Sequence, residues 1–254
     1  MMRRMFQPIA GALLLGLLAV PALAQETAEL PHQKWSFSGP FGTFDRAAAQ
    51  RGYQVYKEVC SNCHSLRHAF YRDLSGIGLS EEQIKATAAS VTVPTLDDSG
   101  QPAERPGLPA DHFRSPFPND LAARAANNGA LPPDLSLIVK AREGGADYVY
   151  ALLNGYGEPP AGMTMGNGMN YNKYFPGNQI GMPQPLTDGR VDYTDGTKDT
   201  LSQEAHDVVT FLAYISSPET EQRKRLGVRM VLFLVVMTGL TYAVKRKIWA
   251  DVEH

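Results

Sequence analysis

The stretch DRAAAQRGYQVYKEVCSNCH, residues 45–64, holds the only two cysteines of this 254-residue chain. Asp45 is a favourable N-cap and apolar residues then recur on one face, so the stretch predicts a helix from about Asp45 to Cys60. Cys60 and Cys63 lie at the carboxyl end of that helix, and His64 follows directly. Such a pair can hold a metal ion, exchange with a disulfide, or carry a covalently attached haem.

Several interpretations of the cysteine pair are disfavoured by its surroundings. A thiol–disulfide motif needs a thioredoxin-like βαβ context, and no strand pattern surrounds this pair. A structural zinc site usually needs four Cys or His ligands, whereas only one pair exists and His64 would crowd Cys63. A disulfide between two cysteines three residues apart at a helix end rarely reaches relaxed geometry.

The spacing C-x-x-C-H is the attachment motif of c-type haem. In this chemistry Cys60 and Cys63 add to the two vinyl groups of the haem. The adjacent His64 then gives the iron its proximal nitrogen ligand. The motif therefore predicts one covalently bound haem c.

The second axial ligand is left open by the motif. A His/Met pair suits an electron carrier, whereas an open site suits gas binding or peroxidase chemistry. The candidates are Met163, Met165, Met169 and Met182, and His32, His68, His112 and His206. Met182 has one local advantage, because Pro183 and Pro185 stiffen its loop. The other three methionines lie in a Gly/Asn-rich stretch that would hold a ligand poorly.

The amino terminus carries an export signal. Arg3 and Arg4 precede an apolar run over residues 9–20, and the small-x-small pattern of residues 22–24 follows. This pattern predicts a secretory signal peptide over residues 1–24 that is cleaved off. A plain secretory signal, in place of a mitochondrial transit sequence, indicates a bacterial protein.

A second apolar run, residues 226–244, would rise roughly 28 Å as a helix, close to the thickness of a bilayer's hydrocarbon core. Basic triplets flank it, so we expect a transmembrane anchor over residues 223–247 and a short cytoplasmic tail over residues 248–254. The signal peptide orients the span. The chain is thus predicted to cross the bacterial inner membrane once, with residues 25–222 as a periplasmic haem domain and a cytoplasmic carboxyl terminus.

The predicted exported domain is acidic. Residues 25–222 contain 15 Lys and Arg against 24 Asp and Glu, a balance of −9. This sign argues against nucleic acid as a partner, because binding to phosphates needs positive charge. A basic protein partner, attracted over long range, is consistent with it.

Two further helices are predicted in this domain. One spans about Ala146 to Asn154 and stops at Gly155; the other spans about Ser202 to Ser216, with Ser202 as its cap. Long turn-rich stretches connect the helices, for example residues 92–109, and nothing alternates long enough to predict a sheet. The expected fold is mainly α, with a large cofactor supplying much of the apolar core.

Longer segments around the motif resemble the cytochrome c1 family, the haem-bearing, membrane-anchored subunits of the cytochrome bc1 complex (quinol:cytochrome c oxidoreductase). The similarity runs from about Gln33 to Trp249. The segments that carry it are WSFSGPFGTFDRAAAQRGYQVYKEVCSNCHSL (35–66), RAANNGALPPDLS (124–136), AREGGADYVYALLNGY (141–156), YFPGNQIGMPQPL (174–186) and RKRLGVRM (223–230).

The resemblance implies a class I c-type cytochrome fold with long irregular insertions and one C-terminal transmembrane helix. It implies that Met182 is the distal iron ligand and that Arg142 and Tyr148 contact the haem propionates. Asn127 and Pro133 match positions that line the haem, Pro133 on the proximal side. Some bacterial members stabilise the distal loop with a disulfide. This chain has no cysteine to spare, so packing alone is expected to hold the Met182 loop.

The resemblance also implies a one-electron relay within a redox-driven, proton-translocating enzyme, with no catalytic residue on this chain. In the family the electron comes from the Rieske iron–sulfur protein and leaves to a c-type cytochrome. The implied partners are cytochrome b, the Rieske protein, a basic c-type cytochrome and membrane lipid, in a dimeric complex. Three alternatives remain open: a stand-alone membrane-anchored periplasmic c-type cytochrome, a haem enzyme with an open distal site, and a redox thiol protein.

Overall fold

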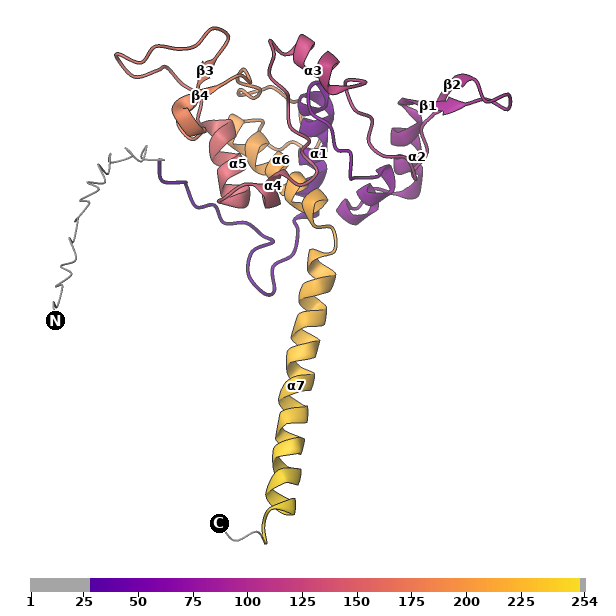
Figure 1. Cartoon of the computed structure of the whole chain (residues 1–254), viewed down its shortest axis with the longest axis vertical. Helices are drawn as coiled ribbons and strands as arrows, with labels where there is room; N and C mark the ends of the chain where they lie inside the picture. The colour runs from indigo at the N-terminus through magenta and orange to yellow at the C-terminus, as the bar shows by residue number, and fades with distance from the viewer. Residues whose placement is uncertain (1–27, 252–254) are drawn as a thin grey trace, which may run out of the picture.

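A helical domain stands at one end of a single long helix in the computed structural model, which describes residues 28–251 (Figure 1). The predicted signal peptide lies outside the described residues, as do the last three residues of the predicted tail. The helices are α1 (Arg46–Glu58), η1 (Cys60–Asn62), η2 (Tyr71–Ile77), α2 (Glu81–Ala89), α3 (Asp120–Ala126), α4 (Ile138–Ala141), α5 (Gly145–Asn154), η3 (Pro176–Asn178), α6 (Leu201–Ser216) and α7 (Thr220–Ile248). The predicted mainly α fold is confirmed.

The core of the domain is built around α6, against which α1, α4 and α5 pack. Helix α1 begins where predicted, because the Asp45 side chain accepts a hydrogen bond from the Ala48 N–H. Gly52 lies where α1 approaches α6, and a Cβ there would be only 1.9 Å from the Asp207 carbonyl oxygen. Glycine is needed at this position for the two helices to meet.

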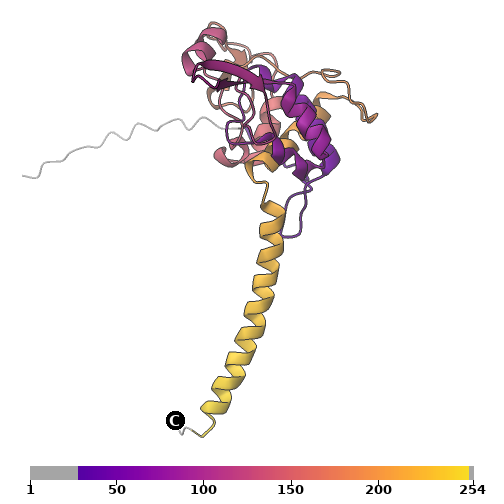
Figure 2. The ribbon, with the colours of Figure 1, turned by 90° about the vertical axis from the view of Figure 1, so that its right-hand side faces the viewer.

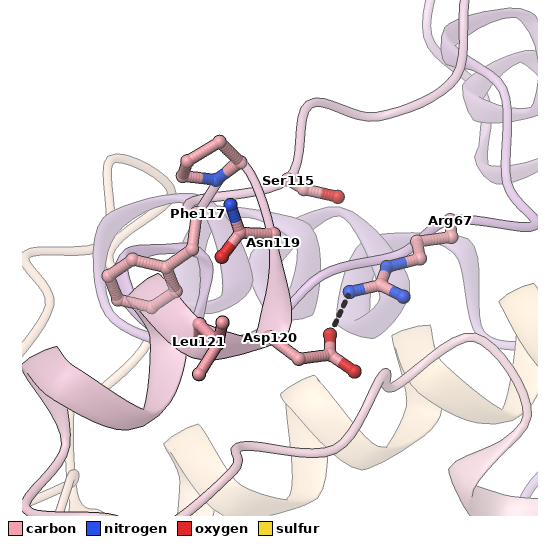
Figure 3. Close-up of a pocket in the computed structure, with 7 residues that line it drawn as sticks. Arg67, Ser115, Phe117, Asn119, Asp120 and Leu121 are labelled. Atoms are coloured by element: carbon pink, nitrogen blue, oxygen red, sulfur yellow. Dashed lines mark ion pairs between the residues drawn. The ribbon is translucent and has the colours of Figure 1, made fainter.

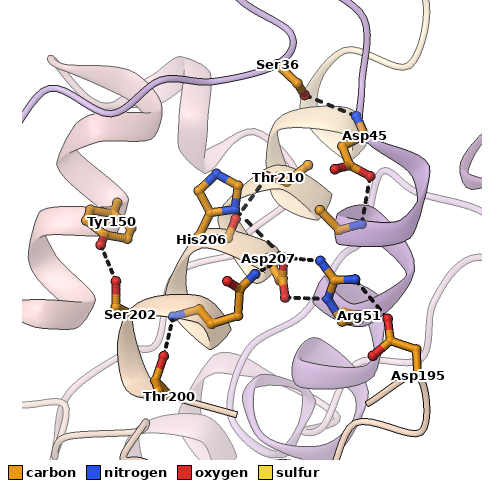
Figure 4. Close-up of polar contacts among 12 residues, drawn as sticks. Ser36, Asp45, Arg51, Tyr150, Asp195, Thr200, Ser202, His206, Asp207 and Thr210 are labelled. Carbon is orange, nitrogen blue, oxygen red and sulfur yellow. Dashed lines mark hydrogen bonds and ion pairs between the residues drawn. The ribbon is translucent and has the colours of Figure 1, made fainter. Parts of the chain in front are cut away.

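A buried ion pair also joins α1 to α6 (Figure 4). The Arg51 guanidinium donates to both carboxylate oxygens of Asp207, at 2.8 and 3.1 Å, and to Asp195 at 2.9 Å. Asp207 is fully buried, so this bidentate contact supplies the partners that a buried carboxylate needs.

The start of α6 differs from the prediction. The helix begins at Leu201, and its N-cap is Thr200, whose hydroxyl accepts a hydrogen bond from the Gln203 N–H at 3.3 Å. The prediction of Ser202 as the cap is therefore wrong. The Ser202 hydroxyl is hydrogen-bonded to the hydroxyl of Tyr150 on α5 instead, at 2.7 Å (Figure 4).

Two small antiparallel sheets occur in the connections: β1 (Thr92–Leu96) with β2 (Pro102–Pro106), and β3 (Asn170–Tyr171) with β4 (Gln179–Ile180). The first corrects the interpretation of residues 92–109 as turn-rich without strands. Asp97 closes its turn by accepting hydrogen bonds from the N–H groups of Ser99 and Gln101. The three prolines of this segment argue against a strand in the sequence. They are tolerated in a two-stranded sheet, because both of its strands are edges.

Helix α7 follows α6 after only three residues, as the sequence predicted, because Ser217 ends one helix and Thr220 begins the next. Among the described residues it is the one helix long and apolar enough to cross a membrane, with a mean hydropathy of 1.8 in its most apolar window. Its apolar side chains from Met230 to Val244 are exposed. The predicted anchor, residues 223–247, falls within this helix.

Candidate haem site

The two cysteines and the histidine are presented by one tight turn. Helix α1 gives way to the 3₁₀ turn Cys60–Asn62, and the Cys60 carbonyl accepts hydrogen bonds from the N–H groups of Cys63 (3.1 Å) and His64 (2.8 Å). The residues between the cysteines stabilise the end of α1: Ser61 donates to the Lys57 carbonyl and Asn62 to the Glu58 carbonyl. Both cysteines are free thiols.

The Cys60 thiol is not an activated thiolate. Burial and the neighbouring Cys63 raise its pKa to about 12. Thiol–disulfide exchange uses a thiolate, which a group with this pKa does not supply at neutral pH. The environment of Cys60 therefore disfavours the redox interpretation of the pair.

The imidazole of His64 is oriented by a backbone carbonyl. Its Nδ1 lies 2.8 Å from the Pro133 oxygen. A carbonyl only accepts, so Nδ1 must carry the hydrogen and Nε2 keeps its lone pair free for a metal. Burial lowers the pKa of His64 and so favours the neutral ring that metal ligation requires.

Asp134 fixes the segment that carries the Pro133 carbonyl. One of its carboxylate oxygens accepts hydrogen bonds from the Ser65 hydroxyl (2.7 Å) and the Arg67 N–H (2.8 Å), and the other from the Ser136 N–H (2.9 Å). Segments 64–68 and 133–136 are thereby joined across almost 70 residues of chain. This role of Asp134 was not predicted, because only its local Asx-type contact to Ser136 has a signal in the sequence.

The Met182 loop lies next to the same segment. A Cβ at Gly181 would be 3.3 Å from the Cβ of Ala130, three residues before Pro133. The backbone carbonyl of Met182 accepts a hydrogen bond from the Tyr156 hydroxyl at 3.1 Å, and Met182 itself is half-buried. The Met182 loop therefore lies beside the segment that carries the Pro133 carbonyl, the hydrogen-bond partner of His64.

A buried asparagine holds the hairpin that leads to Met182. Asn172 donates to the Leu152 carbonyl (2.8 Å), and its side-chain oxygen accepts from the N–H groups of Tyr174 and Phe175 (3.0 and 3.2 Å). Asn172 is fully buried, so these contacts tie the hairpin to the end of α5. The Met182 loop is thus held by hydrogen bonds as well as by the expected packing.

The remaining predicted residues occupy two places. Arg142 ends α4 and is exposed, and its charge acts on the half-buried Tyr148, whose pKa is nevertheless raised by burial. These two side chains therefore lie close together. Asn127 ends α3, and its amide donates to the Ala123 carbonyl at 2.7 Å.

The rival ligands are engaged elsewhere or lie in exposed loops. His32 contacts Asp147 at 3.1 Å, His112 packs on the ring of Phe70, and His206 stacks on Trp35. His68 is exposed, and Met163, Met165 and Met169 lie in a largely exposed connection.

A surface hollow of about 500 Å³ lies beside the segment that follows His64 (Figure 3). The Arg67 guanidinium and the Asp120 carboxylate face each other across it at 3.5 Å. The side chain of Leu121 is 81% exposed next to them. This part of the surface thus combines a compensated charge pair with an exposed apolar residue.

Comparison with known proteins identifies the family. The Cytochrome C1 family matches residues 35–252, most of the chain. This chain belongs to the cytochrome c1 family. It is 48% identical to cytochrome c1, heme protein, mitochondrial, of Saccharomyces cerevisiae, over 91% of this chain and 75% of that protein. It is 46% identical to cytochrome c1 of Rhodospirillum rubrum, over 93% of this chain and 94% of the relative.

A third relative is much longer than this chain. The cytochrome b/c1 protein of Bradyrhizobium diazoefficiens is 48% identical over 95% of this chain, but this chain spans only 39% of its length.

The donor set of this cytochrome c1 family member fits a covalent haem c. A single turn carries two free thiols and one imidazole whose Nε2 is free. Within residues 28–251 no three His, Cys, Asp or Glu side chains lie close enough to hold a metal ion by themselves. A porphyrin supplies four equatorial nitrogens, so the protein has to add only axial ligands and thioether bonds.

Proposed function

We propose that this chain is the electron-transfer subunit of a cytochrome bc1 complex and carries one haem c bonded to Cys60 and Cys63. The observation that carries the proposal is the His64 ring, fixed through Nδ1 on the Pro133 carbonyl beside two free thiols. The bound haem supplies reversible one-electron chemistry. The chain supplies ligation, burial of the ring and docking surfaces, and makes or breaks no substrate bond.

His64 would hold the iron through Nε2, which its Nδ1 contact leaves free, and Met182 would hold it through sulfur. A His/Met pair raises the reduction potential and leaves no open coordination position, as an electron carrier requires. Arg142 and Tyr148 interact with the haem propionates, for which a guanidinium is suited. Pro133 and Asn127 line the haem.

The electron enters from a Rieske iron–sulfur protein and leaves to a basic c-type cytochrome. Cytochrome b is the membrane partner, and the complex is dimeric. Two relatives support this assembly by their names: the cytochrome b/c1 protein, and the cytochrome b-c1 complex catalytic subunit of Candida albicans, 47% identical over 88% of this chain. The balance of −9 over residues 25–222 attracts a basic acceptor and makes its association sensitive to salt.

The chain sits in a bacterial inner membrane. Residues 1–24 are removed after export, residues 25–222 form the periplasmic haem domain, residues 223–247 span the bilayer, and residues 248–254 are cytoplasmic. The exposed apolar surface of α7 and the basic residues at both of its ends support this topology.

Purification from the native membrane tests the proposal. On a denaturing gel the chain should retain a haem stain, and a Cys60→Ala/Cys63→Ala variant should lose it. The chain should also purify in a fixed ratio with cytochrome b and a Rieske protein. A stained chain that purifies without either protein is a stand-alone c-type cytochrome, and an unstained chain refutes covalent haem.

A further inference from the structure

A loop of the haem domain lies against the first turns of α7 and encloses a pocket with it. The loop, residues 37–43, hangs beside the top of α7 in both views (Figures 1 and 2). The pocket, about 290 Å³, is lined by residues 40–43 of the loop and, on the helix, by Glu221, Lys224, Arg225, Val228 and Arg229. It stands at the junction of the domain with its membrane anchor.

The loop is held firmly on the helix. Lys224 Nζ donates to the carbonyls of Phe37 (2.5 Å) and Gly42 (3.2 Å). One Glu221 oxygen accepts from the Phe44 N–H (2.8 Å), and the other accepts from the Arg46 guanidinium (2.9 Å). These contacts clamp the loop at both of its ends, so the pocket is a built feature.

The tip of this clamped loop is apolar and exposed. Phe41 is 80% exposed, and α7 presents an unbroken run of exposed apolar side chains from Met230 to Met237. A single exposed phenylalanine is ordinary on a soluble surface. Here it lies beside the outer end of the membrane helix, where aromatic side chains are enriched at the interface.

The helix side of the pocket has an excess of positive charge, because it carries three basic side chains and one carboxylate, Glu221, which is paired with Arg46. Arg225 and Arg229 are one turn apart on the same face and exposed. Arg225 has one distant partner, Glu221 at 3.4 Å, and Arg229 forms no ion pair within residues 28–251. The positive charge contrasts with the acidic balance of the domain above it and is complementary to an anionic headgroup.

The depth of these arginines matches the phosphate level of a bilayer. Arg229 and Lys245 bound the apolar part of α7. The 16 residue steps between them rise about 24 Å, and both side chains can extend a few ångströms further to the interfaces of a core of about 30 Å. The guanidinium groups of Arg225 and Arg229 therefore reach the outer-leaflet phosphates.

We propose that this pocket binds the phosphate headgroup of an anionic phospholipid in the outer leaflet, an inference that rests on α7 spanning the membrane as proposed above. Arg225 and Arg229 contact the phosphate, and Phe41 inserts between the acyl chains. Because the loop is clamped to both domain and helix, the lipid contact fixes the tilt of the haem domain over the membrane surface.

Spin labels on the haem-loaded full chain in lipid nanodiscs test the insertion of Phe41. The native cysteines are then thioethers, so a Phe41→Cys chain carries one reactive thiol. Its label should be relaxed by oxygen and protected from an aqueous nickel chelate. Asp98→Cys, at the exposed β1–β2 turn, is the aqueous control, and Leu234→Cys reports the anchor.

The three labels separate the two proposals. A label at position 41 as accessible to nickel as that at 98, with 234 buried in lipid, overturns the lipid site and leaves the anchor intact. An aqueous label at 234 overturns the anchor itself. Protection of position 41 from both relaxing agents in the purified complex means that another protein subunit covers the pocket, which also overturns the lipid site.

The charge requirement has its own test. In nanodiscs of mixed phosphatidylglycerol and phosphatidylcholine, the chain should enrich phosphatidylglycerol among its co-purified lipids. Arg225→Gln/Arg229→Gln should reduce that enrichment severalfold. Lys57→Gln/Lys85→Gln removes the same charge from the exposed surface of the haem domain and should leave the enrichment unchanged. Equal enrichment in both double variants contradicts the assignment.

Discussion

Pro133 contributes a backbone carbonyl to the site, yet this oxygen selects the tautomer of His64, 69 residues away in the chain. Asp134 holds the segment that carries this carbonyl, because its carboxylate accepts hydrogen bonds from the Ser65 hydroxyl and the Arg67 N–H. The orientation of one imidazole thus depends on a residue that never touches it. Second-sphere contacts of this kind commonly tune a metal ligand.

The Met182 assignment makes the sharpest prediction for a single residue. Met182→Leu removes the sulfur ligand, so the haem should become partly high-spin, bind carbon monoxide, and lose on the order of 0.1 V or more in midpoint potential. Met169→Leu, a nearby exposed methionine, is the matched control and should leave spectrum and potential unchanged. A low-spin Met182→Leu protein with an unaltered potential would show that another residue is the ligand.

Asn172 should stabilise the Met182 loop without contacting the iron. In Asn172→Ala the Leu152 carbonyl and two backbone N–H groups lose their partner, which should lower the free energy of unfolding by at least about 1–3 kcal/mol. The methionine–iron absorption band should also weaken at lower temperature than in the wild type. Asn167→Ala, in the exposed connection, is the control for both readouts. An unchanged band in Asn172→Ala would limit its role to general stability.

The sequence predicts the motif residues of the site, but not the residues that support them. Cys60, Cys63 and His64 lie within five consecutive residues, so their spacing alone predicts the attachment chemistry. Asn172 and Tyr156 act on partners 20 and 26 residues away. Neither contact has a local pattern, because only the folded chain brings these groups together.

At the scale of elements, the contact between α1 and α6 depends on a missing side chain. Gly52→Ala would place a Cβ 1.9 Å from the Asp207 carbonyl oxygen, so one helix must move. Overpacking of this kind should cost about 1–3 kcal/mol in thermal or urea unfolding. Gly157→Ala, where a Cβ meets nothing within 4 Å, is the control. Equal stability of the two variants would mean that the helices do not pack as closely as described.

The same contact should weaken in acid. Burial raises the pKa of Asp207, but hydrogen bonds from His206, Arg51 and Gln203 outweigh it and hold that pKa below its usual value. As the pH falls, Asp207 is therefore protonated in the unfolded chain before it is protonated in the folded one. The stability contributed by Asp207 is complete above about pH 5 and is lost as the pH falls through the lower folded-state pKa.

Unfolding free energies measured from pH 5 downwards check this sign. Asp207→Asn cannot titrate, so its stability should fall less steeply with acid than that of the wild type. An identical pH slope in the two proteins would assign the acid sensitivity to other carboxylates.

Prediction of the elements succeeded where local signals are strong. The Asp45 cap, the apolar stripe of α6 and the apolar run of α7 each lie within one segment. The β1–β2 hairpin was not predicted, because proline cannot donate to a sheet and is excluded from central strands. The prolines of this segment therefore argued against strands, although both strands of a hairpin are edges. Helix α2 was also missed, although Ser80 and Gln83 form a capping box that marks its start.

At the scale of the whole molecule, composition predicts an acidic domain on a membrane helix, and the structure adds how the two are joined. Lys224 on α7 reaches the Phe37 carbonyl across 187 residues of chain. No periodicity or motif predicts this contact, since it exists only once the domain has folded. The clamp fixes the orientation of the domain relative to α7.

Quinol-driven reduction of the purified complex tests the central claim most directly. Rapid mixing with quinol should reduce one c-type haem per copy of this chain, seen as its absorption band. The band should be absent from a complex carrying Cys60→Ala/Cys63→Ala. A complex in which quinol leaves that haem oxidised, although cytochrome b and the Rieske protein are present, would contradict the assignment of this chain as the electron-transfer subunit.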